Sequence, residues 1–339
     1  WKNSMQYMNN VLVDGAIPAD AGVAIEYKVP LTSKRVDFIL TGQDENQKDL
    51  AVIVELKQWA EVSATTKDAI VETFVGGRVR EVTHPSYQAC TYASLISDFN
   101  VAVQEDDIRL RPCAYLHNCS SGEVIHAPFY DEHTDRAPAF LKGDAHLLRD
   151  FLKKHVRYGD KSEILYRIDN GELRPSKNLA DHLVALLQGN RAFEMIDDQK
   201  VVYETALALA GDSNSTNKNV LLVEGGPGTG KSVLAVNLLV EFTSRKLVTH
   251  YVTRNAAPRA VYERQLTGTF TKSHVGNLFK GSGAYVDTAP NIMDVLVVDE
   301  AHRLNEKSGL YQNKGENQIK EIIQAAKFSI FFVDQDQRV

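Results

Sequence analysis

Short apolar runs broken by turn residues dominate the first third of the chain. Each run is rich in β-branched residues and only as long as a strand, so the pattern predicts a β-sheet. A longer stretch at residues 87–97 has helical spacing and is expected to lie against that sheet. The predicted strands are residues 23–29, 35–41, 50–57 and 108–117.

The pattern changes in the second part of the chain. Between residues 144 and 188, leucines recur at helical spacing, which predicts a helical connector. Beyond a polar loop, short buried-type strands at residues 220–223, 247–253, 295–299 and 328–334 alternate with helical segments, as in a parallel α/β sheet. We therefore expect an α/β chain with an N-terminal domain at residues 1–140, a helical connector at 141–190 and a parallel-sheet domain at 191–339.

Composition restricts the environment and the partners. Hydrophobic residues make up 43% and charged residues 24% of the 339 positions, as in a globular protein. No apolar run reaches the roughly 20 residues that cross a bilayer, and no signal pattern opens the chain, so we expect a cytoplasmic protein without a membrane partner. The net charge of -6 gives no overall attraction for phosphate backbones, so a nucleic-acid surface would have to be a local basic groove.

One glycine-rich segment carries a complete nucleotide-binding motif. It follows the apolar run at residues 220–223 and precedes an amphipathic helical pattern, which is the strand-loop-helix context that G-x-x-x-x-G-K-[ST] requires. Glycines let backbone N–H groups face the phosphates of ATP. Lys231 is expected to reach the β- and γ-phosphates, and the Ser232 hydroxyl to coordinate Mg²⁺. The motif comprises Gly225, Gly226, Pro227, Gly228, Thr229, Gly230, Lys231 and Ser232.

A second motif ends a later strand. The apolar run at residues 295–298 leads directly into Asp299 and Glu300. An aspartate at the end of such a strand holds the magnesium ion of P-loop NTPases, and this is the role we assign to Asp299. Glu300 then stands where a general base could orient the attacking water. The chain is therefore predicted to bind ATP with Mg²⁺ and to hydrolyse it.

The C-terminal part resembles superfamily 1 helicases and, more narrowly, the Schlafen-type DNA/RNA helicase domain. The resemblance covers residues 193–339 and rests on the motifs at residues 251–259, 299–304 and 332–337. It implies the first RecA-like domain of a helicase motor. Because the sequence stops after the last motif, we expect the second motor domain to be absent from this chain. Such a half-motor should bind ATP but hydrolyse it poorly.

The same resemblance implies roles for residues outside the P-loop. Gln199, ahead of the P-loop, corresponds to an adenine-contacting glutamine, with an ordinary solvated helix residue as the alternative. Gln337 corresponds to a glutamine that senses the γ-phosphate. Thr253, Arg254 and Asn255 correspond to the side of the domain that faces a single nucleic-acid strand.

Two charged residues share one face of an otherwise apolar strand in the N-terminal domain. At residues 50–57, the strand period of two puts Glu55 and Lys57 on the same face. If the neighbouring strand pairs with it, Asp37 comes alongside Glu55 and gives two carboxylates for a hard divalent cation. Lys57 would then lie near the water that attacks a phosphodiester. A solvated edge strand is the alternative explanation of this pattern.

A helical pair downstream strengthens the case for a nuclease. Gln88 and Tyr92 are four residues apart and hence share a helix face. Together with the Asp, Glu and Lys above, they resemble the RecB-type nucleases of the PD-(D/E)XK superfamily over residues 23–117. The resemblance implies a RecB-like α/β fold, Mg²⁺ or alternatively Mn²⁺ at the nuclease site, and a supporting role for both helix residues. The family also supplies an acidic or histidine residue ahead of its first strand, for which Glu26 is a nearby substitute with either a catalytic or a structural role.

These features together predict a protein of nuclease-helicase type. The N-terminal domain would cleave DNA, single-stranded or duplex, in a reaction controlled or fed by ATP at the C-terminal domain. Resemblance alone places such pairings in DNA repair or in defence against foreign DNA. The alternative is a non-catalytic, ATP-switched nucleic-acid-binding module with a degenerate nuclease fold. RNA stays open as a substrate because nothing in the sequence reads a 2′-hydroxyl, and the oligomeric state stays open as well.

Overall fold

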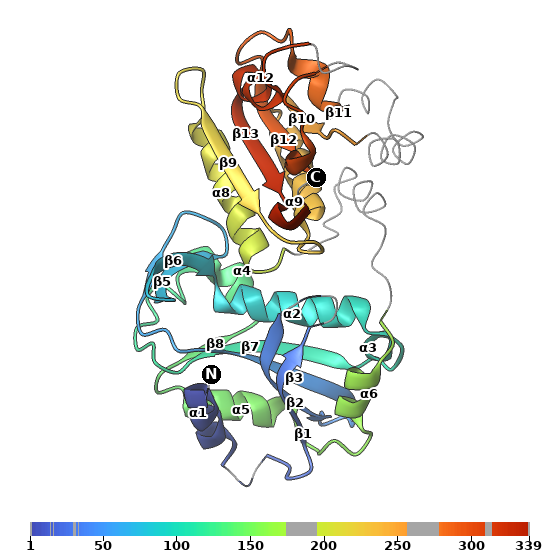
Figure 1. Cartoon of the computed structure of the whole chain (residues 1–339). Coiled ribbons are helices and arrows are strands. Elements are labelled where there is room, and N and C mark those ends of the chain that lie inside the picture. The colour runs from blue at the N-terminus through green and yellow to red at the C-terminus, as the bar shows by residue number, and fades with distance from the viewer. Residues whose placement is uncertain are drawn as a thin grey trace. The chain divides into compact units, whose positions relative to one another are not determined.

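The computed structural model describes residues 2–13, 15, 17–29, 32, 34–173, 195–255, 278–308 and 314–337. They form two compact units. The first unit is Trp1–Ser176 with Ile196–Val201, and the second is Lys177–Met195 with Val202–Val339. Each unit has its own five-stranded sheet (Figure 1). Within these ranges, no helix combines the length and apolar character that crossing a membrane requires.

A mixed sheet forms the centre of the first unit, in the strand order β1-β2-β3-β7-β8. The pairs β1–β2 and β2–β3 are antiparallel, whereas β3–β7 and β7–β8 are parallel. The register pairs Phe38 with Val54, so the next pair along the two strands is Asp37 and Glu55. The strands are β1 (Gly22–Lys28), β2 (Arg35–Gln43), β3 (Asp49–Lys57), β7 (Arg109–Leu116) and β8 (Ala139–Leu141).

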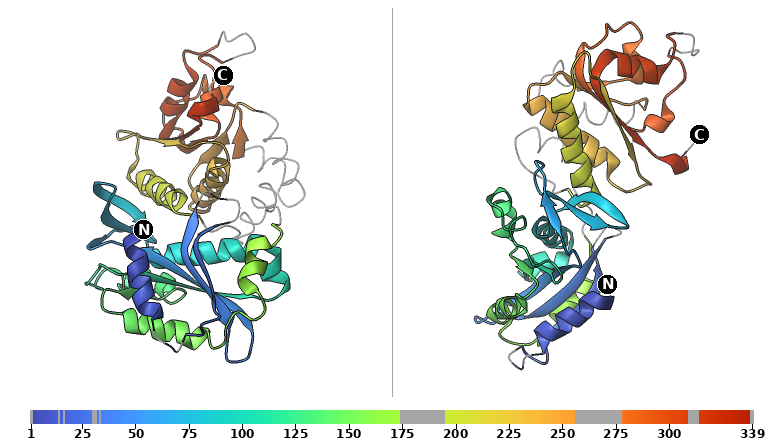
Figure 2. Two further views of the ribbon diagram at one scale, coloured as in Figure 1. Left: turned by 60° about the horizontal axis from the view of Figure 1, so that its bottom comes forward. Right: turned by 90° about the vertical axis from the view of Figure 1, so that its left-hand side faces the viewer.

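Helices cover both faces of this sheet. Figures 1 and 2 show α2 (Pro85–Phe99) along one face, with α1 (Lys2–Leu12) and α5 (Ala145–His155) on the other. Alternate residues of β3 pack into an apolar core with α1 and α5. Because side chains alternate along a strand, Glu55 and Lys57 face α2. The sheet therefore presents its charged residues to the helix that carries the predicted nuclease pair.

Further elements of the first unit lie outside the predicted pattern. A three-stranded antiparallel sheet of β4 (Val62–Ala64), β5 (Ile70–Val75) and β6 (Arg78–Thr83) precedes α2. Of the predicted connector at residues 141–190, the helices α5 and α6 (Ile164–Asn170) pack on the strands of the first unit. Residues 174–190 of that connector lie outside the described residues. The shorter helices are α3 (Val101–Glu105), η1 (Pro128–Tyr130) and α4 (Asp131–Thr134).

The second unit has an all-parallel sheet, in the order β11-β10-β12-β13-β9. The expected alternation of parallel strands and helices is confirmed. Parallel strands place their carboxyl ends at one edge of a sheet, so the loops after β9, β12 and β13 meet there. The strands are β9 (Asn219–Glu224), β10 (Thr249–Val252), β11 (Phe279–Lys280), β12 (Met293–Val298) and β13 (Ala326–Val333).

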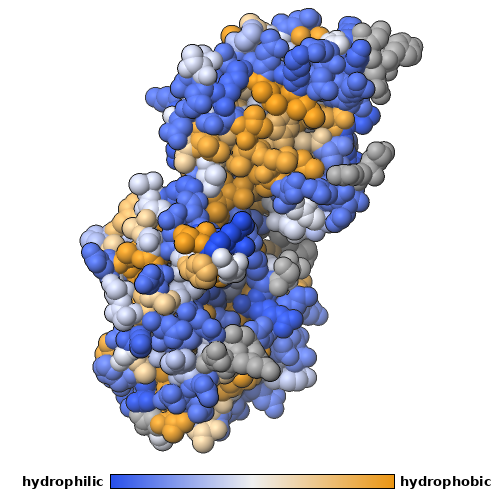
Figure 3. Space-filling model, turned by 60° about the vertical axis from the view of Figure 1, so that its left-hand side comes forward, coloured by the Kyte–Doolittle hydropathy of each residue, from blue (hydrophilic) through white to orange (hydrophobic). Residues whose placement is uncertain are grey.

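Among the described residues, three longer helices accompany this sheet, namely α8 (Asp198–Asp212), α9 (Lys231–Ser244) and α12 (Gln318–Ala325). The apolar side of α9 packs into a core with β10, β12 and β13, whereas α12 belongs to a second core that also lines the sheet. Figure 3 shows a broad apolar patch on one face of this unit, and the edge strand β9 exposes Val220 and Leu222. Short 3-10 turns follow the strands at η2 (Ser282–Tyr285), η3 (Ala301–Arg303) and η4 (Gln335–Gln337).

Candidate functional site

The glycine-rich loop joins β9 to α9 at the carboxyl edge of the second sheet. Gly228 and Gly230 have φ angles of 72° and 83°, a left-handed conformation in which a side chain would be strained. Gly230 is the N-cap of α9 and, having no side chain, leaves the first N–H groups of the helix without a side-chain cap. Uncapped N–H groups and the positive end of the helix dipole favour a phosphate at this position.

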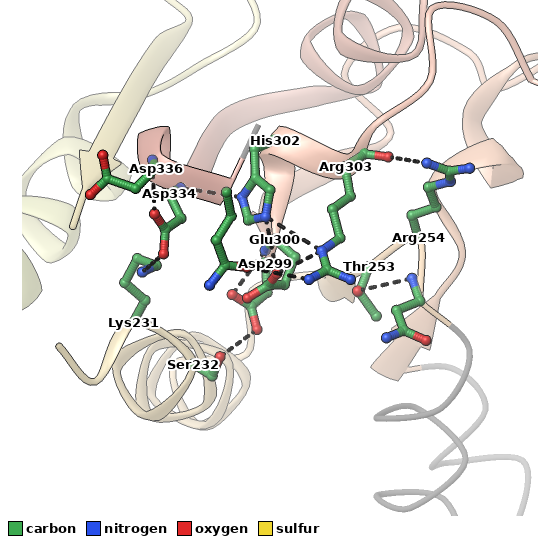
Figure 4. Close-up of polar contacts among 12 residues, drawn as sticks. Lys231, Ser232, Thr253, Arg254, Asp299, Glu300, His302, Arg303, Asp334 and Asp336 are labelled. Carbon is green, nitrogen blue, oxygen red and sulfur yellow. Dashed lines mark hydrogen bonds and ion pairs between the residues drawn. The ribbon is translucent and has the colours of Figure 1, made fainter. Parts of the chain in front are cut away.

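The ammonium group of Lys231 lies within this loop. Its Nζ donates to the carbonyl oxygens of Gly225 at 2.6 Å and Gly226 at 2.8 Å. It also approaches Asp334 Oδ2 at 3.4 Å, just beyond the end of β13 (Figure 4). Asp334 is buried and Lys231 is partly buried, so each charge is stabilised by a partner of opposite charge. The contact with Asp334 was not predicted, although Asp334 stands at the end of a predicted strand.

Asp299 lies buried at the end of β12 and joins two neighbouring elements. Its Oδ2 accepts hydrogen bonds from Ser232 at 2.8 Å and from the Tyr251 hydroxyl at 2.5 Å. The structure thus brings together the two predicted magnesium ligands, Ser232 of α9 and Asp299. Tyr251, on the adjacent parallel strand β10, belongs to the predicted helicase motif at residues 251–259, but its contact with Asp299 was not predicted. A magnesium ion would take oxygen ligands from this pair, so the donor set fits the ion.

Glu300 has a left-handed backbone conformation, with a φ of 55°, and its carboxylate is held by two basic side chains. Glu300 Oε2 lies 3.2 Å from His302 Nε2 and 3.0 Å from Arg303 Nε. His302 Nδ1 accepts from the backbone N–H of Asp334 at 3.2 Å, which holds the ring with Nε2 facing Glu300. Figure 4 shows this cluster beside Asp299. Neither His302 nor Arg303 was predicted to touch the proposed base.

The other residues to which the helicase resemblance assigns a role in this unit lie on different elements. Gln337, in η4, accepts a hydrogen bond from Arg303 Nη2 at 3.3 Å, which connects it to Glu300. Arg254 donates to the backbone carbonyl of Arg303 at 2.9 Å, and Thr253 Oγ1 accepts from the N–H of Asn255. Of the predicted helicase motif at residues 251–259, residues 256–259 lie outside the described residues.

Gln199 lies at the beginning of α8, in the part of that helix which belongs to the first unit. Its Oε1 accepts from the backbone N–H of Ile196 at 3.3 Å. The adenine contact assigned to Gln199 stays a prediction.

In the first unit, the predicted acidic pair and lysine gather on the α2 face of the sheet. Lys57 Nζ lies 2.6 Å from Glu55 Oε1; the Glu55 side chain is buried and that of Lys57 is partly buried. Asp37 Oδ2 accepts from the backbone N–H of Leu56 at 2.8 Å, which fixes its carboxylate beside β3. A solvated edge strand does not describe β3, because it lies between β2 and β7 and its Glu55 is 3% exposed.

The electrostatic balance of this pair depends on two further carboxylates. Burial raises the pKa of Glu55 above its ordinary value; the charge of Lys57 opposes this rise, whereas Asp37 and Asp197 add to it. Burial alone would lower the pKa of Lys57, but Glu55, Asp37 and Asp197 outweigh it and raise that pKa. Burial therefore favours the neutral form of the Glu55 carboxyl group, whereas the surrounding carboxylates favour the charged form of Lys57.

Gln88 and Tyr92 of α2 form hydrogen bonds that lead to Asp197, a residue to which the sequence assigned no role. Gln88 Nε2 donates to the Tyr92 hydroxyl at 2.9 Å, as the shared helix face predicted. The Tyr92 hydroxyl in turn donates to Asp197 Oδ2 at 2.7 Å. Burial and then the negative charge of Asp197 raise the pKa of Tyr92, so the hydroxyl keeps its proton and remains a donor. Glu26 lies elsewhere, on β1, where it faces Arg35 at 3.6 Å.

Two oxygen atoms in this group lack donors. Glu55 Oε2 and Asp197 Oδ1 are both buried, and neither has a hydrogen-bond partner among the described residues. No three His, Cys, Asp or Glu side chains in the described part of the chain are arranged to enclose a metal ion as they stand. The orphaned oxygens nevertheless fit a divalent cation, because Mg²⁺ keeps several waters and needs only one or two carboxylates.

Comparison with known proteins bears on the second unit. Residues 218–339 match the family model described as Schlafen group 3, DNA/RNA helicase domain. The helicase part of the predicted resemblance is thereby confirmed, and it points to an ATPase function related to nucleic acids. The match does not include the first unit. No curated protein and no solved structure matches the chain.

Proposed function

We propose that the second unit is the first RecA-like domain of a superfamily 1 helicase motor and binds ATP with Mg²⁺. The observation that carries this proposal is the meeting of Lys231, Ser232 and Asp299 at the carboxyl edge of the parallel sheet. Bound Mg²⁺ would neutralise phosphate charge, and Ser232 and Asp299 are the residues that would hold it. The family match at residues 218–339 supports the same function.

The contacts around Lys231 suggest how nucleotide enters this site. Its ammonium group is held by two loop carbonyls and by Asp334, all of which a phosphate can replace. Glu300 is the proposed general base, and its carboxylate must leave Arg303 or His302 to accept a proton from water. Arg303 also contacts Gln337, so the proposed γ-phosphate sensor can influence when Glu300 is released.

The first unit is, in this proposal, a RecB-type nuclease domain that cleaves DNA with Mg²⁺ or Mn²⁺. The buried Glu55–Lys57 pair beside Asp37 supports this assignment. Asp37 and Glu55 would hold the cation, which would activate water for attack on a phosphodiester. Lys57 would position that water and stabilise the charge that develops on the phosphate. ATP binding in the second unit would control the cleavage, in a cytoplasmic protein of DNA repair or of defence against foreign DNA.

The experiment is a cleavage panel of single-stranded DNA, duplex DNA and RNA, each with Mg²⁺ or Mn²⁺ and with or without ATP. We expect DNA to be cut by the parent and not by Glu55→Gln, which keeps the size of the side chain but removes its charge. A circular dichroism melt in EDTA checks that the variant is folded, because Lys57 loses its buried partner. If the parent cuts none of the substrates but binds nucleic acid in an ATP-dependent way, the non-catalytic module is the better description.

A further inference from the structure

The hairpin of β5 and β6 exposes an apolar pair near its tip. Phe74 is 67% exposed and Val79 is 64% exposed, and the two residues face each other across the strands. Paired residues lie on the same side of a two-stranded ribbon, so these side chains form one continuous apolar surface. Large apolar side chains that gather at the surface mark contact sites, whereas single ones are ordinary. This side of the hairpin is therefore open to contact with another molecule.

The hairpin holds its tip in one conformation. Gly76 and Gly77 have φ angles of 61° and 82°, as in the two-residue turn that matches the twist of paired strands. At the other end of the hairpin, Ile70 pairs with Thr83, and both residues are buried. A strand rises about 3.3 Å per residue, so the turn lies roughly 20 Å along the hairpin from this buried base. The tip is therefore formed before any partner binds.

Two arginines give the tip a positive charge. Arg78 and Arg80 are exposed on the side of the ribbon opposite the apolar pair, and neither forms an ion pair within the ranges that the structure describes. The first acidic residues below the tip are Glu72 and Glu81, and Lys67 Nζ lies 2.6 Å from Glu81 Oε2. In a chain with a net charge of -6, the tip is thus a local positive surface of the kind that attracts phosphate groups.

The hairpin lies in the segment that joins two elements of the carboxylate site, which we define as Asp37, Glu55 and Lys57. β3 ends at Lys57, and β4, the first strand of the small sheet, follows within a few residues. At its other end, β6 leads directly into α2 through the N-cap residue His84. Figure 1 shows β5 and β6 at the N-terminal end of α2. A molecule bound at the tip is therefore held by the segment that connects the lysine of the site to the helix above it.

We infer that the β5–β6 hairpin binds single-stranded nucleic acid, with a base stacked on Phe74 and with phosphates held by Arg78 and Arg80. Every base offers a flat face to an aromatic ring, and arginine binds phosphate oxygens whatever the sequence. Because the apolar pair and the arginines lie on opposite sides of the ribbon, the strand would pass around the tip, and an intact duplex is too stiff to do so. This inference rests on the proposed function and deepens it, because it names the part of the first unit that holds the nucleic acid.

Fluorescence anisotropy with a labelled DNA single strand of about 20 nucleotides tests this inference. EDTA is present, so that binding is measured without cleavage. We expect Phe74→Ala to weaken binding roughly 10-fold or more, whereas Phe74→Trp, which keeps an aromatic face, should stay within about twofold of the parent. The matched control is Tyr166→Ala, because Tyr166 of α6 is another aromatic residue of the first unit and is 63% exposed. Relaxed circular duplex DNA should displace the strand poorly from the parent.

The salt dependence of binding tests the two arginines separately from the ring. Each phosphate of a single strand that a protein neutralises contributes about 0.7 to the slope of log affinity against log salt concentration. The double variant Arg78→Gln/Arg80→Gln should therefore lower the magnitude of this slope by about 1.4. Arg111→Gln/Arg157→Gln removes two exposed arginines elsewhere in the first unit and should leave the slope unchanged. An equal change in both double variants would mean that net charge, and not the hairpin, attracts the strand.

The outcomes separate this inference from the function on which it rests. If Phe74→Ala binds the strand as tightly as the parent, the hairpin is not the contact surface, its apolar tip serves another partner such as a protein, and the proposed nuclease stands. If the hairpin variants lose affinity but the parent cuts no substrate in Mg²⁺, the inference holds and the nuclease assignment fails. If the parent does not bind the strand, both the inference and the proposed action on DNA fail.

Discussion

The two candidate sites differ in how far the protein satisfies its own charges. In the second unit, Lys231 is paired with Asp334 and two loop carbonyls, and Asp299 accepts from Ser232 and Tyr251. In the first unit, one oxygen of Glu55 and one of Asp197 are buried without a partner among the described residues. The side chains of Lys231 and Asp299 therefore have protein partners at the nucleotide site, whereas two carboxylate oxygens of the first unit have none among the described residues.

Because of this difference, we expect the two sites to respond differently when their ligands bind. ATP must displace existing contacts of Lys231, so nucleotide affinity reflects an exchange of partners. A cation at Glu55 would displace no protein donor from its free oxygen, so it should stabilise the first unit by binding to the folded state. Substitution of the charged residues at each site tests whether ligand binding depends on them.

The largest expected effect is on nucleotide affinity. Lys231→Ala removes two charge-assisted hydrogen bonds to phosphate, each worth about 2 kcal/mol, so ATP should bind about 1,000-fold more weakly. Calorimetric titration with Mg²⁺ and ATP measures this loss. Lys320→Ala is the control, because Lys320 is an exposed lysine of α12 that pairs with Glu316. Equal affinity of Lys231→Ala and the parent would contradict the assignment of the P-loop.

The second largest expected effect is on the rate of DNA cleavage at the carboxylate site. Asp37→Asn keeps an oxygen that can accept from the N–H of Leu56 but removes a metal-binding charge. We expect cleavage of DNA to slow by about 3 kcal/mol in the activation barrier, more than 100-fold. Initial rates in Mg²⁺ measure it, with Glu26→Gln on β1 as the control acidic variant. Should Asp37→Asn cut at the parent rate, the carboxylates of the first unit are structural and the contrast between the sites disappears.

Hydrolysis in the second unit should be sensitive to Glu300. Glu300→Gln leaves Asp299 and Ser232 unchanged but removes the proposed base, so turnover should fall roughly 100-fold while ATP affinity stays close to that of the parent. Single-turnover hydrolysis with excess protein measures this rate even where turnover is slow. Glu306→Gln, at an exposed position after η3, is the control. Parent-like turnover of Glu300→Gln would assign the base to another residue.

Local patterns made most of the fold predictable. The strand period identified β3 and the shared face of Glu55 and Lys57, and the P-loop was recognised because the whole motif lies within one continuous segment. The sheet of β4, β5 and β6 was missed although β5 has buried residues, because β4 has only three residues and β6 is polar with a single buried residue, Thr83. Its polar sequence gives no strand signal of the kind that buried strands give.

Long-range partners were not predictable for a different reason. Tyr92 and Asp197 are 105 residues apart, and Tyr251 and Asp299 are 48 apart, so no motif connects either pair. Asp197 stands directly before α8, where an acidic residue is common because it favours the helix dipole. Nothing in the local sequence therefore marks Asp197 as a partner of Tyr92. A sequence can show which residues share a face, but only the fold shows which distant loop covers that face.

The stability of α2, the helix that covers the carboxylate site, should depend on pH through its N-cap residue His84. His84 caps α2 by accepting from the N–H of Ser86 at Nδ1, and its Nε2 faces the carbonyl of Ile125. Burial, with smaller contributions from the charges of His133 and His126, lowers the pKa of His84 to about 4. The stability it provides is complete above the unfolded pKa of 6.5 and is lost as pH falls towards about 4.

We expect the first unit to lose about 2 kcal/mol of unfolding free energy from His84 between pH 6.5 and 4.5. Urea unfolding at several pH values measures this loss. Other groups titrate in the same range, so the informative quantity is the difference from His84→Asn, which can keep the helix cap but has no proton to gain. If parent and variant lose stability in parallel, protonation of His84 does not weaken the cap of α2.

The smallest expected effect is the one that joins the two sites. The predicted adenine residue, Gln199, is two positions from Asp197, and α8 continues from the first unit into the second. ATP that engages Gln199 should therefore disturb Asp197 and its hydrogen bond with Tyr92, and shift Mn²⁺ affinity at the carboxylate site by roughly threefold, about 0.6 kcal/mol, below the usual range of allosteric coupling. Mn²⁺ titration with and without a non-hydrolysable ATP analogue measures this shift.

Two variants test the route of this coupling. Gln199→Ala should still bind the analogue through Lys231 but lose the shift in Mn²⁺ affinity. Lys231→Ala should lose both the binding of the analogue and the shift, while it keeps the Mn²⁺ affinity of the parent. A shift that persists in Gln199→Ala would mean that α8 does not carry the coupling, and one that persists in Lys231→Ala would mean that it does not begin at the P-loop.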